Sequence, residues 1–180
     1  MTAPPGAAGI VIRDAADADF AAITDIYAHH VRFSLGSFEE IPPTLEEMAR
    51  RRGDVLARNL PYLVAVNPSG AVRGYAYAAP YRARTAYRFS VEDSVYVAPD
   101  AGRQGIGRRL VAELIERCAK TGCRQMVAVI GDSGNIASIS LHEQLGFRHV
   151  GILTAIGFKQ GRWVDSVLMQ RALGEGADRP

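Results

Sequence analysis

The chain has 180 residues, 48% of them apolar, and its 21 basic and 19 acidic side chains leave a net charge of +2. This size and composition predict one globular domain with a hydrophobic core. No apolar run approaches the roughly 20 residues of a membrane span, and no basic arm carries interleaved aromatic residues, so we expect neither a membrane nor a nucleic-acid partner.

We divide the chain into an Ala-, Pro- and Gly-rich N-terminus at residues 1–9, a domain at residues 10–172 and a tail at residues 173–180. The N-terminus has no basic start and no apolar segment, so it is not typical of a signal peptide. Both ends are expected to be flexible.

In the first part of the domain, segments with an apolar residue at every second position alternate with segments whose apolar residues repeat about every 3.6 positions. The first pattern predicts strands and the second predicts helices. The expected elements are a strand at residues 10–13, helices at 17–30 and 44–58, and a hairpin of strands at 62–66 and 72–78. Asp14 or Asp17 is expected to cap the first helix, and Thr44 with Glu47 to form a capping box for the second.

A glycine-rich turn at residues 102–107 follows the predicted central strand, residues 89–97, and opens a helix that runs to Lys120. Glycines let the backbone approach a bulky anion, and the first N–H groups of a helix have no partner inside it. The turn therefore predicts a phosphate-binding site near the carboxylate of Glu92. An ordinary turn without a ligand is the alternative.

Two other phosphate-binding patterns fail at this turn. A dinucleotide-binding G-x-G-x-x-G pattern that starts at Gly105 meets Leu110 at its third glycine position, and residues 125–130 contain no acid for a ribose. A triphosphate-binding loop requires Lys and then Ser or Thr where Arg108 and Arg109 stand, so nothing would hold Mg²⁺.

The last part of the domain is predicted to contain a buried strand, a helix and a hairpin. The strand is expected at residues 124–130. The helix is expected between its cap, Asn135, and Gly146, which ends it, and the hairpin strands at 149–158 and 163–171. Cys118 and Cys123 are expected to be buried thiols in a reducing cytosol rather than a disulfide, which predicts a cytoplasmic protein. The cysteines and the four scattered histidines lack zinc-site spacing, so we expect no metal.

Two signatures about 30 residues apart resemble those of the GCN5-related N-acetyltransferases, the GNAT family. The first is Gly105-Ile106-Gly107, although Gly102 stands where the family keeps Gln or Arg. The second runs from Asn135 to Phe147. The resemblance covers about residues 10–172 and implies the GNAT fold: α/β, with a mixed, mostly antiparallel sheet, flanking helices and a central strand pair that splays at a bulge.

The resemblance also implies acetyl-CoA as the co-substrate. Backbone groups of the splayed strand would bind its pantetheine arm, and the N–H of Val97 is the candidate donor to the oxyanion of the transition state. The expected cofactor-binding residues are Val95, Tyr96, Val97, Arg103, Gln104, Gly105, Ile106, Gly107, Arg108, Asn135 and Ser138.

Glu92 is the candidate base, because an amine attacks a thioester only when it is neutral and must lose a proton. Its strand is otherwise suited to burial, and burial raises the pKa of a carboxyl group. Strand alternation puts Glu92 and Asp93 on opposite faces. Asp93 therefore remains a competing base, acting with water.

His142 is the candidate proton donor to the leaving thiolate, because the family commonly has a tyrosine with that role at this position. His142 lies seven residues after Asn135, near two helical turns, so both can face one side. A helix histidine with satisfied hydrogen bonds is the alternative.

Five further segments resemble one branch of the family, the phosphinothricin and methionine sulfoximine acetyltransferases. They are residues 33–40, 80–87, 90–97, 141–143 and 157–165. This resemblance implies a small amino acid substrate, acetylated at its α-amine by direct transfer in a ternary complex, and a homodimer. Phe33 and Tyr81 depart from the branch and could reshape the pocket.

The substrate side of the site is predicted from side-chain chemistry. Arg82 and Arg84 are two residues apart and could hold a carboxylate or phosphinate together, with two solvated arginines as the alternative. The expected substrate-binding residues are Phe38, Glu39, Arg82, Arg84, Tyr87, Glu92 and Ser94. Phe38 and Tyr87 would wall the pocket unless they are core aromatics, and Glu39 would meet an ammonium or sulfoximine group.

Three functions are consistent with these residues. The main hypothesis is an acetyl-CoA-dependent N-acetyltransferase of a small amino acid analogue of the phosphinothricin, methionine sulfoximine or methionine sulfone type. The alternatives are a protein or peptide N-acetyltransferase and a CoA-binding module without catalysis.

Overall fold

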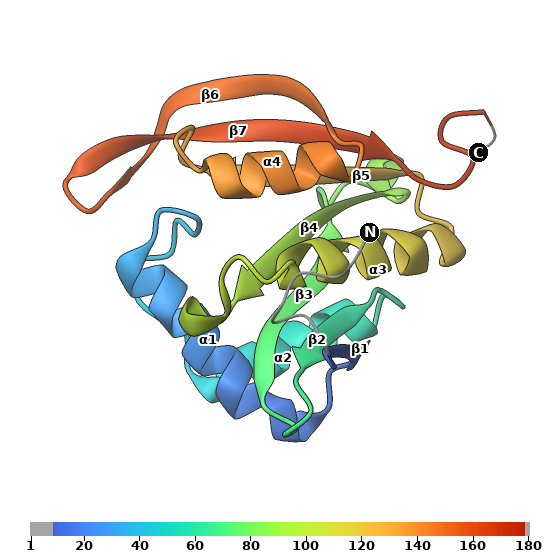
Figure 1. Cartoon of the computed structure of the whole chain (residues 1–180). Coiled ribbons are helices and arrows are strands. Elements are labelled where there is room, and N and C mark those ends of the chain that lie inside the picture. The colour runs from blue at the N-terminus through green and yellow to red at the C-terminus, as the bar shows by residue number, and fades with distance from the viewer. Residues whose placement is uncertain (1–8, 179–180) are drawn as a thin grey trace.

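The computed structural model describes residues 9–178. Seven strands form one sheet in the order β1-β2-β3-β4-β5-β7-β6, and only β4 and β5 are parallel neighbours (Figure 1). The predicted mixed, mostly antiparallel α/β sheet is thus confirmed. The strands are β1 (Val11–Asp14), β2 (Tyr62–Val66), β3 (Val72–Pro80), β4 (Ser90–Val97), β5 (Gln125–Gly131), β6 (Arg148–Lys159) and β7 (Arg162–Ala172).

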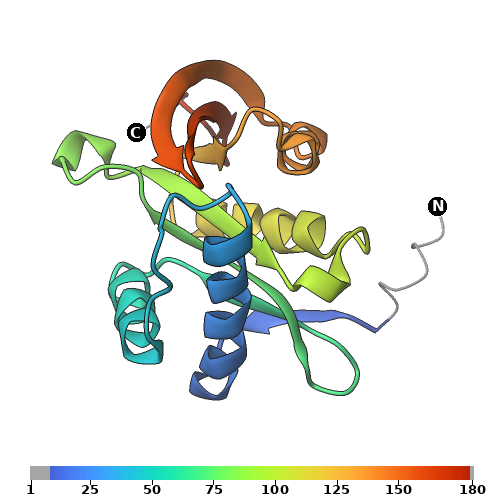
Figure 2. The ribbon, with the colours of Figure 1, turned by 90° about the vertical axis from the view of Figure 1, so that its left-hand side faces the viewer.

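Helices cover both faces of this sheet. They are α1 (Phe20–Phe33), α2 (Leu45–Leu56), α3 (Ile106–Lys120) and α4 (Ile136–Gln144). On β4, the ring of Tyr96 packs against Tyr27 of α1, whereas the neighbouring Val97 turns toward Gly107 of α3. Figure 2 shows α1 and α2 on one side of the strands and α3 and α4 on the other. The sheet is therefore the middle of three layers.

The first helix differs from its prediction at both ends. A 3-10 turn at Asp17–Asp19 precedes it, so that α1 begins at Phe20 and ends at Phe33. Neither expected acid caps it, because Asp14 pairs with Arg117 and Asp17 pairs with Arg52.

The second helix begins as predicted. The side-chain oxygen of Thr44 accepts a hydrogen bond from the N–H of Glu47 at 3.2 Å. The carboxylate of Glu47 pairs with Arg50 and Arg51 instead of completing the capping box. These ion pairs lie on the exposed face of α2, where they contribute little to stability.

The ends of the domain are only partly described, since residues 1–8 and 179–180 of the predicted flexible termini lie outside the described range. The predicted boundary at residue 172 is too early. Leu173 is 2% exposed, and its N–H donates to the carbonyl of Arg124 on the neighbouring strand connection. The packed domain therefore includes Leu173.

Three further features of the described residues bear on disulfide formation, metal binding and membrane insertion. Cys118 and Cys123 are both buried and unbridged, as predicted. Within residues 9–178, no cluster of three His, Cys, Asp or Glu side chains is arranged to hold a metal ion. No helix in this range combines the length and the apolarity that crossing a membrane requires.

Candidate active site

The two parallel strands at the centre of the sheet separate halfway along their length. β4 pairs with β5 only from Ser90 to Asp93, and its later residues pair with β3 alone. The predicted splay is therefore present. The predicted bulge is not, because the register between β3 and β4 is regular from Gly74 to Pro80.

This separation leaves one edge of β4 without a strand partner. N–H groups alternate along a strand between its two neighbours, and the N–H of Ala98, directly after β4, donates to the carbonyl of Arg73 on β3. The N–H groups of Val95 and Val97 consequently point away from β3 into the gap. Both are oriented to donate to a ligand there.

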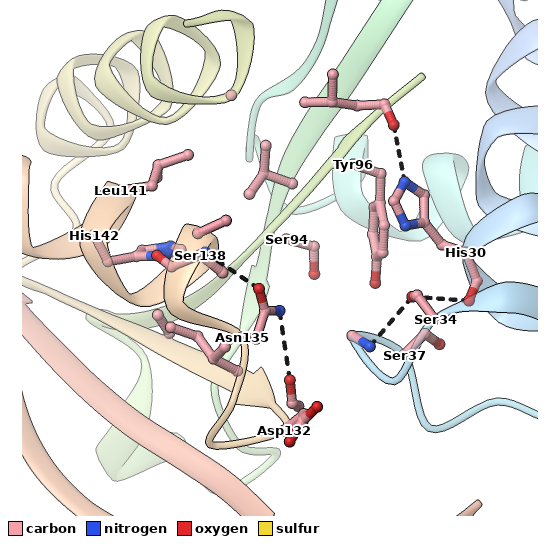
Figure 3. A pocket seen from close by; sticks show the side chains of 18 of the residues that line it. His30, Ser34, Ser37, Ser94, Tyr96, Asp132, Asn135, Ser138, Leu141 and His142 are labelled. Carbon is pink, nitrogen blue, oxygen red and sulfur yellow. Dashed lines mark hydrogen bonds between the residues drawn. The ribbon is translucent and has the colours of Figure 1, made fainter. Parts of the chain in front are cut away.

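A cleft of about 1410 Å³ opens at this gap. Figure 3 shows Ser34 and Ser37 of the loop after α1 on one side, and Asn135 and Ser138 of α4 on the other. The predicted cofactor residues that line it are Val95, Tyr96, Val97, Arg103, Gly105, Ile106, Gly107, Arg108, Asn135 and Ser138. Gln104 is not among the lining residues.

The glycine-rich turn has the geometry of an anion site. Gly105 directly precedes α3 and has φ 73°, in the left-handed region that favours glycine. A Cβ on Gly105 would meet nothing within 4 Å, whereas one on Gly107 would lie 2.9 Å from Cδ1 of Leu141. The unpaired N–H groups at the start of α3 therefore face an open space.

Asn135 orders the opposite wall of the cleft. Its side-chain oxygen accepts a hydrogen bond from the N–H of Ser138 at 3.3 Å, which caps α4 as predicted. Its amide group donates to the carbonyl of Gly131 at the end of β5. Asn135 thus ties the start of α4 to the strand that diverges from β4.

Glu92 lies on β4 just before the point where the strands separate. Its side chain is half-buried in the cleft wall and has no hydrogen-bond partner within residues 9–178. Burial raises the pKa of Glu92 above its ordinary value, the charge of Asp93 raises it further, and Arg82 opposes both. A carboxylate without partners and with a raised pKa is suited to accept a proton.

Asp93 and His142 form a buried pair on the other face of β4. Oδ2 of Asp93 lies 3.0 Å from Nε2 of His142, and the two side chains are 1% and 3% exposed. Nδ1 of His142 lies 2.7 Å from the carbonyl oxygen of Ser138. Both ring nitrogens are thus engaged, as in the alternative of a helix histidine with satisfied hydrogen bonds.

His30 is a cleft residue that the sequence analysis did not select. Its Nε2 donates to the carbonyl of Val97 at 2.9 Å, and its ring packs on Tyr96. Burial lowers the pKa of His30 despite that hydrogen bond. A signal was present in the sequence, because His30 continues the helical spacing of Ile23, Ile26 and Tyr27 on the buried face of α1.

The loop at residues 34–39 forms the second wall of the cleft. Glu39 lines it, but its Oε1 accepts hydrogen bonds from the hydroxyl of Tyr27 at 2.9 Å and from Arg51 at 2.6 Å. The protein itself thus compensates the charge that was expected to meet a substrate. Phe38 and Ser94, both predicted to bind substrate, also line the cleft.

Three predicted substrate residues lie outside the cleft lining. Arg82, Arg84 and Tyr87 belong to the exposed β3–β4 connection. The guanidinium of Arg82 lies 5.1 Å from the centre of the Tyr81 ring. Arg82 is still near enough to lower the pKa of Glu92, so it lies at the approach to the site rather than inside it.

Comparisons with known proteins agree with this geometry. The sequence pattern of the acetyltransferase (GNAT) family matches residues 23–147. The phosphinothricin N-acetyltransferase of Alcaligenes faecalis is 55% identical over 165 residues, which cover 92% of this chain and 83% of that protein. The L-methionine sulfoximine/L-methionine sulfone acetyltransferase of Pseudomonas paraeruginosa is 40% identical over 172 residues, 94% of this chain and 98% of that protein.

A solved structure is similar as well. The GNAT superfamily phosphinothricin acetyltransferase (Pat) from Sinorhizobium meliloti, in complex with AcCoA, superposes with a TM-score of 0.92 at 48% identity. The match covers 95% of this chain and 92% of that one. The likeness therefore extends over the sheet, the cleft and the C-terminal hairpin.

Proposed function

The chain belongs to the acetyltransferase (GNAT) family, and we propose that it transfers the acetyl group of acetyl-CoA to the α-amine of a small amino acid analogue. The analogue is of the phosphinothricin, methionine sulfoximine or methionine sulfone type, as the names of similar proteins suggest. The observation that carries this proposal is the half-buried carboxylate of Glu92, with its raised pKa, beside the open edge of β4.

The cleft fits acetyl-CoA in two respects. The start of α3 and the open space at Gly105 suit the pyrophosphate. The unpaired edge of β4 suits an extended, amide-bearing arm, which would add to the sheet as a strand does. Bound acetyl-CoA supplies an activated acyl group as a thioester.

The residues of the chain then have separate proposed roles. Glu92 accepts the proton of the substrate ammonium, directly or through water. The N–H of Val97, or that of Val95 with the same orientation, donates to the oxyanion. Protonation of the thiolate stays assigned to His142 as a prediction: the proton passes from the imidazolium to the sulfur, and the bond to Asp93 would hold the ring in place.

Recognition of the amino acid stays a prediction from the sequence. Arg82 and Arg84 are proposed to attract the carboxylate or phosphinate at the approach to the cleft. Phe38 and Ser94 line the cleft and are proposed to contact the substrate, whereas Tyr87 lies outside the lining and its role rests on the family resemblance.

Release of the free thiol of CoA tests the function directly. Acetyl-CoA is offered with proteinogenic amino acids, methionine sulfone, methionine sulfoximine and phosphinothricin, and with short peptides as a separate arm. Acceleration by the amino acid analogues supports the proposal. Acceleration by peptides alone points to a protein N-acetyltransferase, and binding of acetyl-CoA without any turnover points to a non-catalytic module.

We further propose a cytoplasmic homodimer. Free buried cysteines are typical of a reducing compartment. The edge strand β6 exposes an apolar surface that suits a second copy. We define this β6 surface by Val150, Ile152, Ile156 and Phe158 of β6 together with Trp163 of the neighbouring β7.

A further inference from the structure

The loop at residues 34–39 lies against the tip of the β6–β7 hairpin, which comes more than one hundred residues later in the chain. Figures 1 and 2 both place this loop next to the hairpin. The tip is a two-residue turn in which Gln160 has φ 52° and Gly161 has φ 75°. These angles are those of a type I′ turn, which holds the ends of two strands in a fixed arrangement.

Lys159 at this tip is a buried amine. It is 4% exposed, and its Nζ donates to the carbonyl of Ser34 at 2.9 Å and to the carbonyl of Ser37 at 2.6 Å. The next residue, Gln160, donates to the carbonyl of Arg32 at 3.1 Å. Lysine is seldom buried unless its charge has partners, so these bonds are a specific feature of the loop.

The choice of lysine at this position is itself informative. The chain contains only two lysines, Lys120 and Lys159, among its 21 basic residues. A compact ammonium on a long apolar stem can reach into a narrow space and bond two carbonyls, whereas the wide planar guanidinium of arginine needs more room. Residue 159 therefore stands out in a chain that otherwise uses arginine.

Glycines on two strands make room for the same loop. A Cβ on Gly157 of β6 would lie 2.3 Å from Cε2 of Phe38, and a Cβ on Gly131 of β5 would lie 2.2 Å from the carbonyl oxygen of Leu35. On its other side the loop is held by Tyr27, whose hydroxyl lies 3.0 Å from Oγ of Ser37. The loop is thus fixed between α1 and the C-terminal hairpin.

We propose that Lys159 is a positioning residue for the amine acceptor, because it holds the 34–39 loop in the conformation that walls the substrate side of the cleft. Ser34 and Ser37 lie on that wall, opposite the wall with Asn135 and Ser138 (Figure 3), and Phe38 of the same loop also lines the cleft. Only the kinetic effects expected from this inference rest on the proposed function. The contacts of Lys159 do not involve the glycine-rich turn, so acetyl-CoA binding is left unaffected.

The Lys159→Met variant tests this inference, because methionine keeps the apolar stem and removes the ammonium. We expect kcat/KM for the amino acid acceptor to fall by about 10- to 100-fold, since small misplacements of a substrate wall have effects of this size. KM for acetyl-CoA is expected to change by less than about twofold, because the substitution does not touch the glycine-rich turn. Lys120→Met, at the exposed end of α3, is the matched control and should behave as the wild type.

A second measurement is independent of turnover. Hydrogen exchange followed by mass spectrometry is expected to show faster exchange in residues 34–39 of Lys159→Met, with the segment around Gly105 unchanged. If the wild type acetylates no acceptor, the proposed function fails, and the exchange result still decides on the role of Lys159. Unchanged exchange in this loop, or a parallel rise of KM for both substrates, overturns the inference.

Should Lys159→Met not fold, Gly157→Ala gives the same test, because its new methyl group displaces Phe38 while Lys159 stays in place. Faster exchange in residues 34–39 with a lower kcat/KM for the acceptor is again the expected result. Wild-type exchange and kinetics in Gly157→Ala would show that the loop does not depend on the hairpin.

Discussion

His142 and Asp93 share a hydrogen bond of 3.0 Å in which the proton has two available positions. Nδ1 of His142 must donate to the carbonyl of Ser138, because a carbonyl can only accept. Nε2 is then either protonated and donating to the Asp93 carboxylate, or unprotonated and accepting from the carboxylic acid. In either state the pair is neutral overall, which is what burial of two titratable groups requires.

The first prediction concerns the pH dependence of stability. Burial lowers the pKa of His142, but the bond and the charge of Asp93 outweigh it and leave the pKa above 6.5. The stabilisation is therefore fully present below pH 6.5 and is lost as the pH rises through the raised pKa. The double variant Asp93→Asn/His142→Leu removes both titrating groups without leaving an unpaired buried charge, so its loss of stability relative to the wild type should be greatest at low pH.

Urea unfolding of the wild type and Asp93→Asn/His142→Leu across pH 5 to 9 measures this difference. The free energies of unfolding should converge as the pH rises. Other titratable groups near the pair are Glu92 and Cys118, so the same series in a Glu92→Gln background separates their contributions. A difference that is flat or grows with pH would contradict an ionised pair.

The second prediction concerns Glu92. Removing the proton acceptor with Glu92→Gln should lower kcat by about 10²- to 10⁴-fold. Because burial, aided by Asp93, raises the pKa of Glu92, its ionised form is less stable in the folded chain than in the unfolded chain at neutral pH. Glu92→Gln should therefore also raise Tm at pH 7, and the gain should vanish at pH values below 4.5.

Kinetics and thermal scans over pH 4 to 8 check both parts. The acid limb of the wild-type rate profile should lie above pH 4.5 and disappear in the variant. Asp93→Asn serves as the comparison, because Asp93 is the competing base. If Asp93→Asn loses more activity than Glu92→Gln without unfolding, the assignment of the base is reversed.

The third prediction concerns Gly102, where the family keeps Gln or Arg. Gly102 has φ −61° and ψ 155°, and a Cβ there would meet nothing within 4 Å. Any residue can adopt this backbone conformation, so Gly102→Gln is expected to fold normally. An added side chain next to the start of α3 should lower KM for acetyl-CoA a few-fold by supplying one more donor to a phosphate.

Gly102→Ala and Gly105→Ala complete this series. Gly102→Ala adds no donor and should leave KM for acetyl-CoA unchanged. Gly105→Ala also meets open space, but its φ of 73° disfavours a side chain by about 1 kcal/mol. Isothermal titration with CoA measures the affinities of the variants. If Gly102→Gln binds CoA no more tightly than Gly102→Ala, a glutamine side chain at residue 102 adds no donor to a phosphate.

The sequence predicted the parts of the site that depend on local backbone patterns. The turn at Gly105 and Gly107 and the cap at Asn135 follow from spacing and side-chain type, and both line the cleft. Alternation placed Glu92 and Asp93 on opposite faces of β4. Asp93 pairs with His142 of α4, and both carboxylates belong to the cleft lining.

Contacts between distant segments were not predictable in this way. The clamp of Lys159 on Ser34 and Ser37 spans more than 120 residues, and no local pattern encodes which loop a hairpin tip meets. The prediction that Arg82 and Arg84 hold the substrate assumes an extended loop in which residues two apart point the same way. The structure places both in the exposed β3–β4 connection, which includes a 3-10 turn at Thr85–Tyr87, and outside the cleft lining.

The last prediction concerns the β6 surface. β6 is an edge strand of 12 residues, and Ile156, Phe158 and the neighbouring Trp163 of β7 are each more than half exposed. An exposed apolar edge strand is a ready surface for pairing between chains, so we expect the wild type to elute as a dimer in size-exclusion chromatography with light scattering. Ile156→Glu should halve the measured mass, since it would bury a charge at the interface. Val11→Glu on the opposite edge strand, also apolar and exposed, is the control and should remain dimeric. A monomeric wild type, or a dimeric Ile156→Glu, would rule out the β6 surface as the interface.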